Sequence, residues 1–202
     1  MMKRIALFLA AAACLLAGCS RTQKFTFQGD FDSARITVAA DSLLLQSDGL
    51  PVPVVIPVKD KSFSFSGEVK KPCLASLKPL VANAPKIYPD LILEKGNITF
   101  QDGRAVGTPL NDAIVQFVDR LKGFRTEYPG NPEGLKKAVE DEFVSFVTAH
   151  KNDPCATYAI LLARGRVSKE TLQKLISTAS PEVQNVGEIR QLKNELKRKV
   201  SE

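Results

Sequence analysis

Few side chains in this sequence could carry out acid–base, thiol or metal chemistry, and they are scattered along it. His150 is the only histidine, which excludes a histidine-rich metal site. Cys73 and Cys155 are far apart and do not form the Cys-x-x-Cys pair that dithiol redox chemistry uses. We therefore expect His150 to lie at a helix end or on the surface. We expect both cysteines to be unpaired, small apolar residues of a core.

The acidic residues form no catalytic or metal-binding pattern either. Glu140, Asp141 and Glu142 point to different sides of a predicted helix, which favours a solvated helix face. Asp30 and Asp32 lie in a predicted turn, without a third ligand at the spacing that calcium requires. The sequence has no glycine-rich phosphate-binding loop and no Gly-x-Ser-x-Gly motif. We therefore predict that the protein is not an enzyme and holds no metal ion or cofactor.

The N-terminus carries the most specific signal in the sequence. A basic start precedes an apolar run over residues 5–17, shorter than the ~20 residues of a membrane-spanning helix. The run ends in Leu-Ala-Gly-Cys at positions 16–19, which resembles the lipobox of bacterial lipoproteins. The resemblance implies that a signal peptide over 1–18 is removed and that the Cys19 thiol is lipidated. An ordinary signal peptide followed by an unmodified cysteine is the alternative.

The residues beyond the lipobox indicate location and exclude some partners. Ser20 stands where an aspartate would signal retention in the inner membrane, so we expect the periplasmic face of the outer membrane. The formal net charge is +6, and the basic excess gathers over residues 190–199 with Glu195 interleaved. This pattern favours a solvated helix face over a nucleic-acid site, because an exported protein rarely meets nucleic acid.

The first half of the chain has the pattern of a β domain. Residues 25–107 alternate between apolar and polar side chains with a period of two. Three prolines, Pro51 just before the segment 52–58 and Pro53 and Pro57 within it, predict an edge strand or an extended loop there. Lys95 and Gly96 predict a tight hairpin between strands at 91–94 and 97–100. Many short strands favour an antiparallel β-sandwich or a partly open barrel. The other predicted strands lie at 25–29, 35–38, 43–45, 62–66 and 73–77.

After residue 107 the hydrophobic period becomes helical. Thr108 is the expected N-cap of a first helix and Pro109 its first residue, and a loop is expected over 124–131. The sequence therefore predicts the α+β class, with a tether over 19–24, a β domain over 25–107 and a helical domain over 108–202. Further helices are expected to start at 131–132, 152–154, 168 and 180–181, the last with one apolar stripe running to Leu196.

Four stretches, in this order, resemble one family of Gram-negative envelope lipoproteins. It is the domain of unknown function 4369, which lies N-terminal to thioredoxin-like, AhpC/TSA-type thiol-disulfide oxidoreductases. The resemblance covers residues 25–199, including the predicted helices. The stretches are Phe-Thr-Phe-Gln-Gly at 25–29, Ser-Phe-Ser-Phe-Ser-Gly-Glu-Val at 62–69, Leu-Ile-Leu-Glu-Lys-Gly at 91–96 and Val-Gly-Thr-Pro-Leu-Asn at 106–111.

The chain differs from that family in one respect that determines the function we expect. A thioredoxin domain would follow in the family, whereas this chain ends at Glu202, so the family's redox residues have no positions here. We therefore expect a non-catalytic binding or docking module of the envelope. The alternative is the accessory half of a thiol-disulfide oxidoreductase whose thioredoxin domain is lost or supplied by a separate chain. The expected partners are the membrane, through the lipid anchor, and a thioredoxin-like protein or a second copy of the chain, with no nucleic acid.

The last helices suggest where such a partner could dock. In the family that the chain resembles, part of the helical surface over 155–199 would face the thioredoxin domain. The alternative is that these helices close on one another and on the sheet. The hypothesised docking residues are Leu172, Leu175, Ile189, Leu192 and Leu196.

Overall fold

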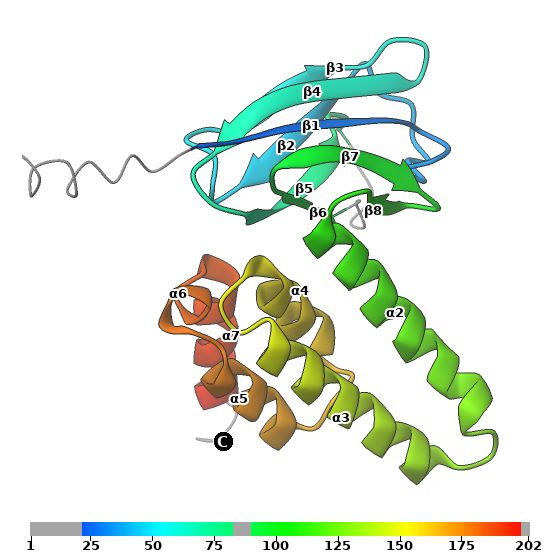
Figure 1. The fold of residues 1–202 in the computed structure, drawn as a ribbon, viewed down its shortest axis with the longest axis vertical. Coiled ribbons are helices and arrows are strands. Elements are labelled where there is room, and N and C mark those ends of the chain that lie inside the picture. The colour runs from blue at the N-terminus through cyan, green and yellow to red at the C-terminus, as the bar shows by residue number, and fades with distance from the viewer. Residues whose placement is uncertain (1–21, 83–89, 199–202) are drawn as a thin grey trace, which may run out of the picture.

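The computed structural model describes residues 22–82 and 90–198, which form a β-sandwich and a helical layer below it (Figure 1). The expected signal peptide, Cys19 and the first half of the tether lie outside the described residues, and β1 begins within the second half of the tether, at Gln23. Within the described residues eight strands precede six helices, so the α+β class is confirmed. The strands are β1 (Gln23–Asp30), β2 (Ser42–Ser47), β3 (Val54–Pro57), β4 (Ser62–Val69), β5 (Cys73–Pro79), β6 (Asp90–Leu93), β7 (Gly96–Gln101) and β8 (Arg104–Val106).

The strands form two four-stranded sheets with the orders β4-β1-β7-β8 and β3-β2-β5-β6. The proline-containing strand β3 lies at an edge, as expected. The sandwich is not purely antiparallel, because β1 and β7 pair in parallel with Phe27 opposite Ile98. The predicted hairpin around Lys95 and Gly96 is wrong, because β6 belongs to one sheet and β7 to the other. Glu94 and Lys95, between the end of β6 and the start of β7, therefore carry the chain from one sheet to the other.

An aromatic cluster fills the space between the sheets. Phe27 of β1 and Phe63 of β4 both meet Phe100 of β7 edge to face, with ring centroids 6.4 and 5.6 Å apart. Gly29 makes this packing possible, since a Cβ there would lie 2.9 Å from the Phe100 ring. The alternation of phenylalanine with small polar residues in β1 and β4 thus produces one buried face on each strand.

Tight turns and one irregular loop close the end of the sandwich. Asp60 and Lys61 both have positive φ, at 49° and 62°, as a two-residue hairpin between β3 and β4 requires. The predicted strand at 35–38 is wrong, since these residues lie in a loop. Ile36 is nevertheless buried, and its N–H donates to the Phe31 carbonyl. Its apolar character therefore reflects a loop that covers the core.

The helical layer departs from the sequence prediction at two boundaries. α2 continues to Glu127, so the expected loop over 124–131 starts four residues late, and Phe124 is buried on that helix. The single helix expected from Ser180 is two helices that meet near Asn185. None of the helices in the described part of the chain is long and apolar enough to cross a membrane. They are α2 (Pro109–Glu127), α3 (Pro132–Ala149), α4 (Pro154–Ala163), α5 (Lys169–Thr178), α6 (Pro181–Gln184) and α7 (Gly187–Arg198).

The helices close on one another around a core of their own. Phe117 of α2 packs edge to face on Phe143 of α3, with centroids 5.2 Å apart. The hypothesised docking residues belong to this core, so they do not form an exposed surface, and the alternative arrangement is the one observed. Four of the five are buried and the last is half-buried against the same cluster: Leu172, Leu175, Ile189, Leu192 and Leu196.

A buried polar junction joins the helical layer to the sandwich. Asn111, in the first turn of α2, accepts a hydrogen bond from the N–H of Ile92 and donates one to its carbonyl, both 2.8 Å long. Ile92 lies in β6, an edge strand, so the amide covers a free strand edge much as another strand would. The start of α2 is thereby fixed on the sheet.

The same junction explains an unexpected helix cap. Thr108 stands at the N-cap position of α2, yet its side chain accepts no backbone N–H there. Glu94, which follows β6, supplies the acceptor: its Oε1 lies 2.8 Å from the N of Leu110 and 3.2 Å from the N of Asn111. A carboxylate at a helix N-terminus satisfies free N–H groups and complements the helix dipole.

Candidate functional site

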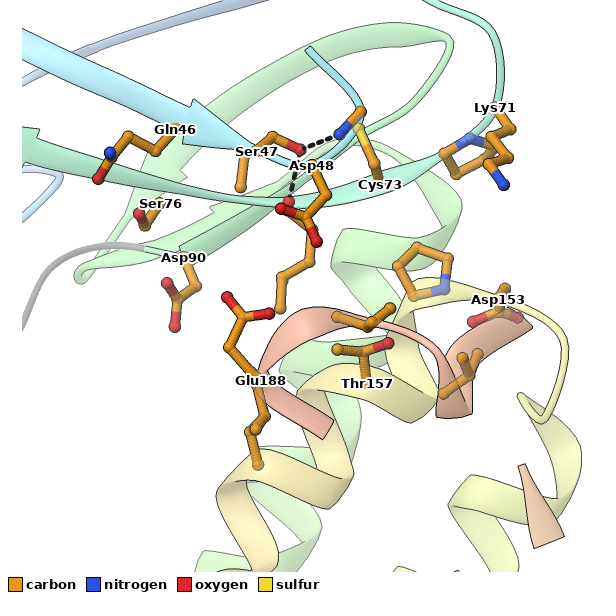
Figure 2. Close-up of a pocket in the computed structure, with 18 of the residues that line it drawn as sticks. Gln46, Ser47, Asp48, Lys71, Cys73, Ser76, Asp90, Asp153, Thr157 and Glu188 are labelled. Atoms are coloured by element: carbon orange, nitrogen blue, oxygen red, sulfur yellow. Dashed lines mark hydrogen bonds between the residues drawn. The ribbon is translucent and has the colours of Figure 1, made fainter. Parts of the chain in front are cut away.

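A cleft of about 840 Å³ lies between the outer face of the sheet β3-β2-β5-β6 and the helices α4, α6 and α7 (Figure 2). The sheet side is made by the end of β2, the outward side chains of β5 and the start of β6. The helical side is made by the start of α4 and the junction of α6 with α7. Lys71 forms an ion pair with Glu182 and so connects the two sides at the exposed rim.

The charge of the cleft is opposite to that of the whole chain. Its lining contains five carboxylates and two lysines, whereas the chain carries a formal net charge of +6. Figure 2 shows Asp48, Asp90 and Glu188 extending into the cleft from the sheet side and the helix side. Among the described residues, none of these three carboxylates forms a salt bridge within 4.0 Å. The lining therefore favours a ligand with positive charge or several hydrogen-bond donors.

Asp90 is the carboxylate with the clearest perturbation. It lies at the start of β6, exposed on one side, yet desolvation of its carboxyl raises its pKa to about 6. The positive charge of Lys78 lowers the pKa of Asp90 and only partly offsets the effect of desolvation. The ammonium of Lys78 also donates a hydrogen bond to Gln46 Oε1 at 2.7 Å. Asp90 therefore becomes fully charged only above weakly acidic pH.

Cys73 lies half-buried in the cleft wall. Burial raises the pKa of its thiol, and hydrogen bonding to Ser47 and Gly49 lowers it to a smaller extent. Ser47 is itself fixed, since its Oγ donates to the Leu74 carbonyl at 2.7 Å. A thiol with a raised pKa is a poor nucleophile at neutral pH, so its surroundings suit packing rather than redox chemistry.

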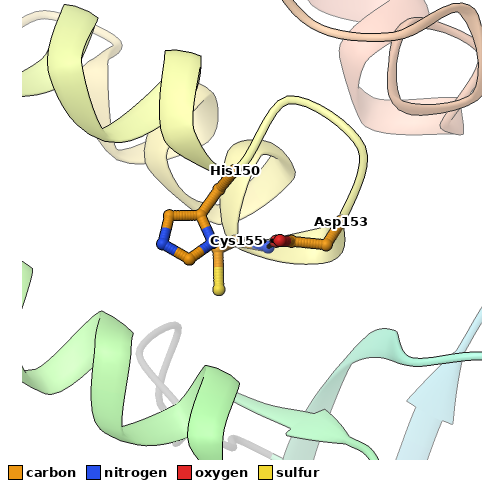
Figure 3. A group of neighbouring side chains, drawn as sticks. All are labelled: His150, Asp153 and Cys155. Atoms are coloured by element: carbon orange, nitrogen blue, oxygen red, sulfur yellow. Dashed lines mark hydrogen bonds and ion pairs between the residues drawn. The ribbon is translucent and has the colours of Figure 1, made fainter.

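A second group of reactive side chains lies where α3 ends and α4 begins (Figure 3). His150 Nδ1 is 2.9 Å from Asp153 Oδ2, and the other carboxylate oxygen accepts the N–H of Cys155 at 2.9 Å. One donor atom from each of these three residues lies within 4.8 Å of the other two. Sequence analysis missed this group, although the His-x-x-Asp-x-Cys spacing across a predicted helix end was visible.

Cys155 is completely buried, in the first turn of α4. Desolvation strongly raises the pKa of its thiol, and the carboxylate of Asp153 adds to the effect. Its Sγ lies 3.5 Å from the Leu110 carbonyl, near the start of α2. Both Cys73 and Cys155 are free thiols, as expected.

The remaining sequence candidates have structural roles. His150 is the C-cap of α3, as expected, with its ring centroid 4.5 Å from that of Phe146. Glu140 is not simply part of a solvated face, because its carboxylate accepts the N–H of Ser168 and the hydroxyl of Thr171, both at 2.8 Å. The first of these bonds is the main reason that the pKa of Glu140 is lowered. Asp30 accepts the N–H of Ser33 at 2.7 Å and thereby closes a turn.

Comparison with protein-family models, with curated proteins and with solved structures found no match to this chain. The resemblance to the domain of unknown function 4369 family therefore stays a prediction.

Proposed function

We propose that this chain is a non-catalytic binding module of the bacterial envelope, held on the membrane by a lipid on Cys19. The Leu-Ala-Gly-Cys sequence at 16–19 supports the anchor. The cleft between the sandwich and the helices supports the binding role. Clefts between two structural layers, with convergent polar groups, are common ligand sites in proteins.

The single observation that carries the binding role is the acidic lining of this cleft in a basic chain. Asp48, Asp90 and Glu188 converge from two layers of the fold and are not neutralised by salt bridges among the described residues. We therefore propose a ligand that carries amino or guanidinium groups, such as a basic peptide segment. The buried junction at the start of α2 holds the walls in place before the ligand binds.

Fluorescence anisotropy with labelled tri-lysine, and with labelled tri-glutamate as the opposite charge, tests this proposal on the full chain in detergent. Tri-lysine should bind with an affinity that falls as salt is added, because the attraction is between exposed charges. Asp90→Asn and Glu188→Gln should each weaken binding by up to about fivefold, the equivalent of ~1 kcal/mol for a solvated ion pair.

Glu133→Gln provides the matched control. Glu133 is exposed in the first turn of α3, at the end of this helix that points away from the sheets (Figure 1), and it does not line the cleft. Its replacement should leave tri-lysine affinity unchanged. Equal binding of tri-glutamate, or an equal loss of affinity in the control variant, would contradict the proposal.

A further inference from the structure

The group formed by His150, Asp153 and Cys155 has the composition of a metal site. It offers one imidazole nitrogen, one carboxylate oxygen and one thiol sulfur, all within 4.8 Å of one another. In a tetrahedral zinc site the donors lie about 2.0–2.3 Å from the ion, and hence about 3.3–3.8 Å from each other. The present separations, at most 4.8 Å, are therefore within about 1.5 Å of those that an ion would impose.

The three side chains are positioned by contacts that do not depend on an ion. His150 is held by its place at the end of α3 and by packing on the Phe146 ring. Asp153 is the N-cap of α4, and this role uses only its Oδ1. Its Oδ2 faces His150 and is the oxygen available to an ion.

We propose that His150 Nδ1, Asp153 Oδ2 and Cys155 Sγ bind one zinc-class divalent cation. Three protein ligands of these types, with a fourth position open to water, are common in zinc proteins. The side chains of His150 and Asp153 are 22% and 29% exposed, so an ion can reach the group although Cys155 is buried. Asp153 also lines the acidic cleft, which gives a cation a path to the site.

Binding requires two protons to move. The Cys155 thiol releases its proton to solvent as the sulfur–metal bond forms, and Sγ gives up its contact with the Leu110 carbonyl. His150 must carry its proton on Nε2, so that the Nδ1 lone pair faces the ion. The ion then replaces the hydrogen bond between His150 and Asp153.

Cobalt(II) titration of the full chain in detergent tests the site, because a cobalt–thiolate bond gives a near-ultraviolet charge-transfer band. We expect one equivalent of Co²⁺ to produce the band and Zn²⁺ to abolish it. Cys155→Ser should remove the band. His150→Gln should weaken Zn²⁺ binding at least about tenfold in competition with a chromophoric chelator, since even outer-shell changes at metal sites cost that much.

Cys73→Ser is the matched control, because it changes the other free thiol of the described residues and should leave the band intact. Circular dichroism reports whether each variant folds, and His150→Gln, at a partly exposed position, tests the site even if Cys155→Ser unfolds. The proposal fails if no band forms, if the band survives in Cys155→Ser, or if His150→Gln binds Zn²⁺ as tightly as the parent chain. In that case His150 and Asp153 serve only as caps of α3 and α4. The cleft proposal is unaffected, because tri-lysine binding is measured without metal.

Discussion

Replacing Asn111 by alanine should reveal how strongly the two layers of the fold depend on one buried side chain. Asn111 is 2% exposed, and its amide makes three hydrogen bonds, two to the backbone of Ile92 and one to Thr108 Oγ1, each 2.8 Å long. Alanine removes the amide and keeps the helix, in which alanine is the most favourable residue. The effect therefore comes from the lost contacts and not from helix propensity.

The size of the effect follows from what the substitution leaves behind. Ile92 is completely buried, so its N–H and its carbonyl both lose their partner away from water. An unsatisfied buried polar group costs about 1–3 kcal/mol. A water molecule could enter the vacated space and form a hydrogen bond with one of these two backbone groups. We therefore expect a total loss of about 2–4 kcal/mol in the free energy of unfolding.

Urea unfolding followed by circular dichroism measures this loss, with the denaturant slope fitted separately for each variant. Asn194→Ala is the matched control, because Asn194 is exposed on α7 and the same substitution there should change stability by less than about 0.5 kcal/mol. If Asn111→Ala also changes stability by less than that amount, the junction does not depend on this amide and the reasoning is refuted.

Three further predictions follow from other positions. Glu94→Gln should destabilise the chain by about 1–2 kcal/mol in the same urea assay, because the start of α2 loses a charged acceptor. Asp90 has a pKa raised from 3.8 to about 6 in the folded chain, so its contribution to stability is complete below pH 3.8 and is lost as the pH rises through 6. Between these values the parent chain should lose thermal stability relative to Asp90→Asn, and parallel melting curves would contradict the prediction. Cys19→Ser should move the protein from the membrane fraction to the soluble fraction in detergent-free buffer, and a variant that still sediments with membranes would argue against lipid anchoring.

The sequence patterns predicted local structure well where that structure depends only on residues close together in the sequence. The helices expected from 131–132, 152–154, 168 and 180–181 begin there, and the N-cap residues Asn131, Asp153, Ser168 and Ser180 each accept a backbone N–H. Such starts are predictable because a cap depends on only three or four neighbouring residues. Thr108 failed as a cap for the opposite reason. The acceptor at that helix end comes from Glu94, which is brought there by the crossing between the two sheets.

The error at Lys95 and Gly96 has the same physical origin. A glycine between two short apolar runs predicts a hairpin, but whether the runs pair depends on which sheets they join. Here β7 pairs with β1 from the start of the chain, across more than 60 residues of sequence, and local patterns carry no information on such a pairing. The cleft could not be predicted for this reason, since its walls come from segments near residues 48, 90, 154 and 188.

The orientation of the cleft walls depends on the buried junction rather than on the ion pair at the rim. Lys71 and Glu182 are 66% and 60% exposed, and an exposed ion pair contributes only about 0–1 kcal/mol. The contacts of Asn111 and Glu94 are buried, and each stabilises the fold by more. Leu110 links this junction to the second site, because its N–H donates to Glu94 and its carbonyl contacts Cys155 Sγ. A change at the start of α2 should therefore alter the orientation of the cleft walls and also reach the second site, whereas loss of the rim ion pair should change the charge at the rim and leave that orientation unchanged.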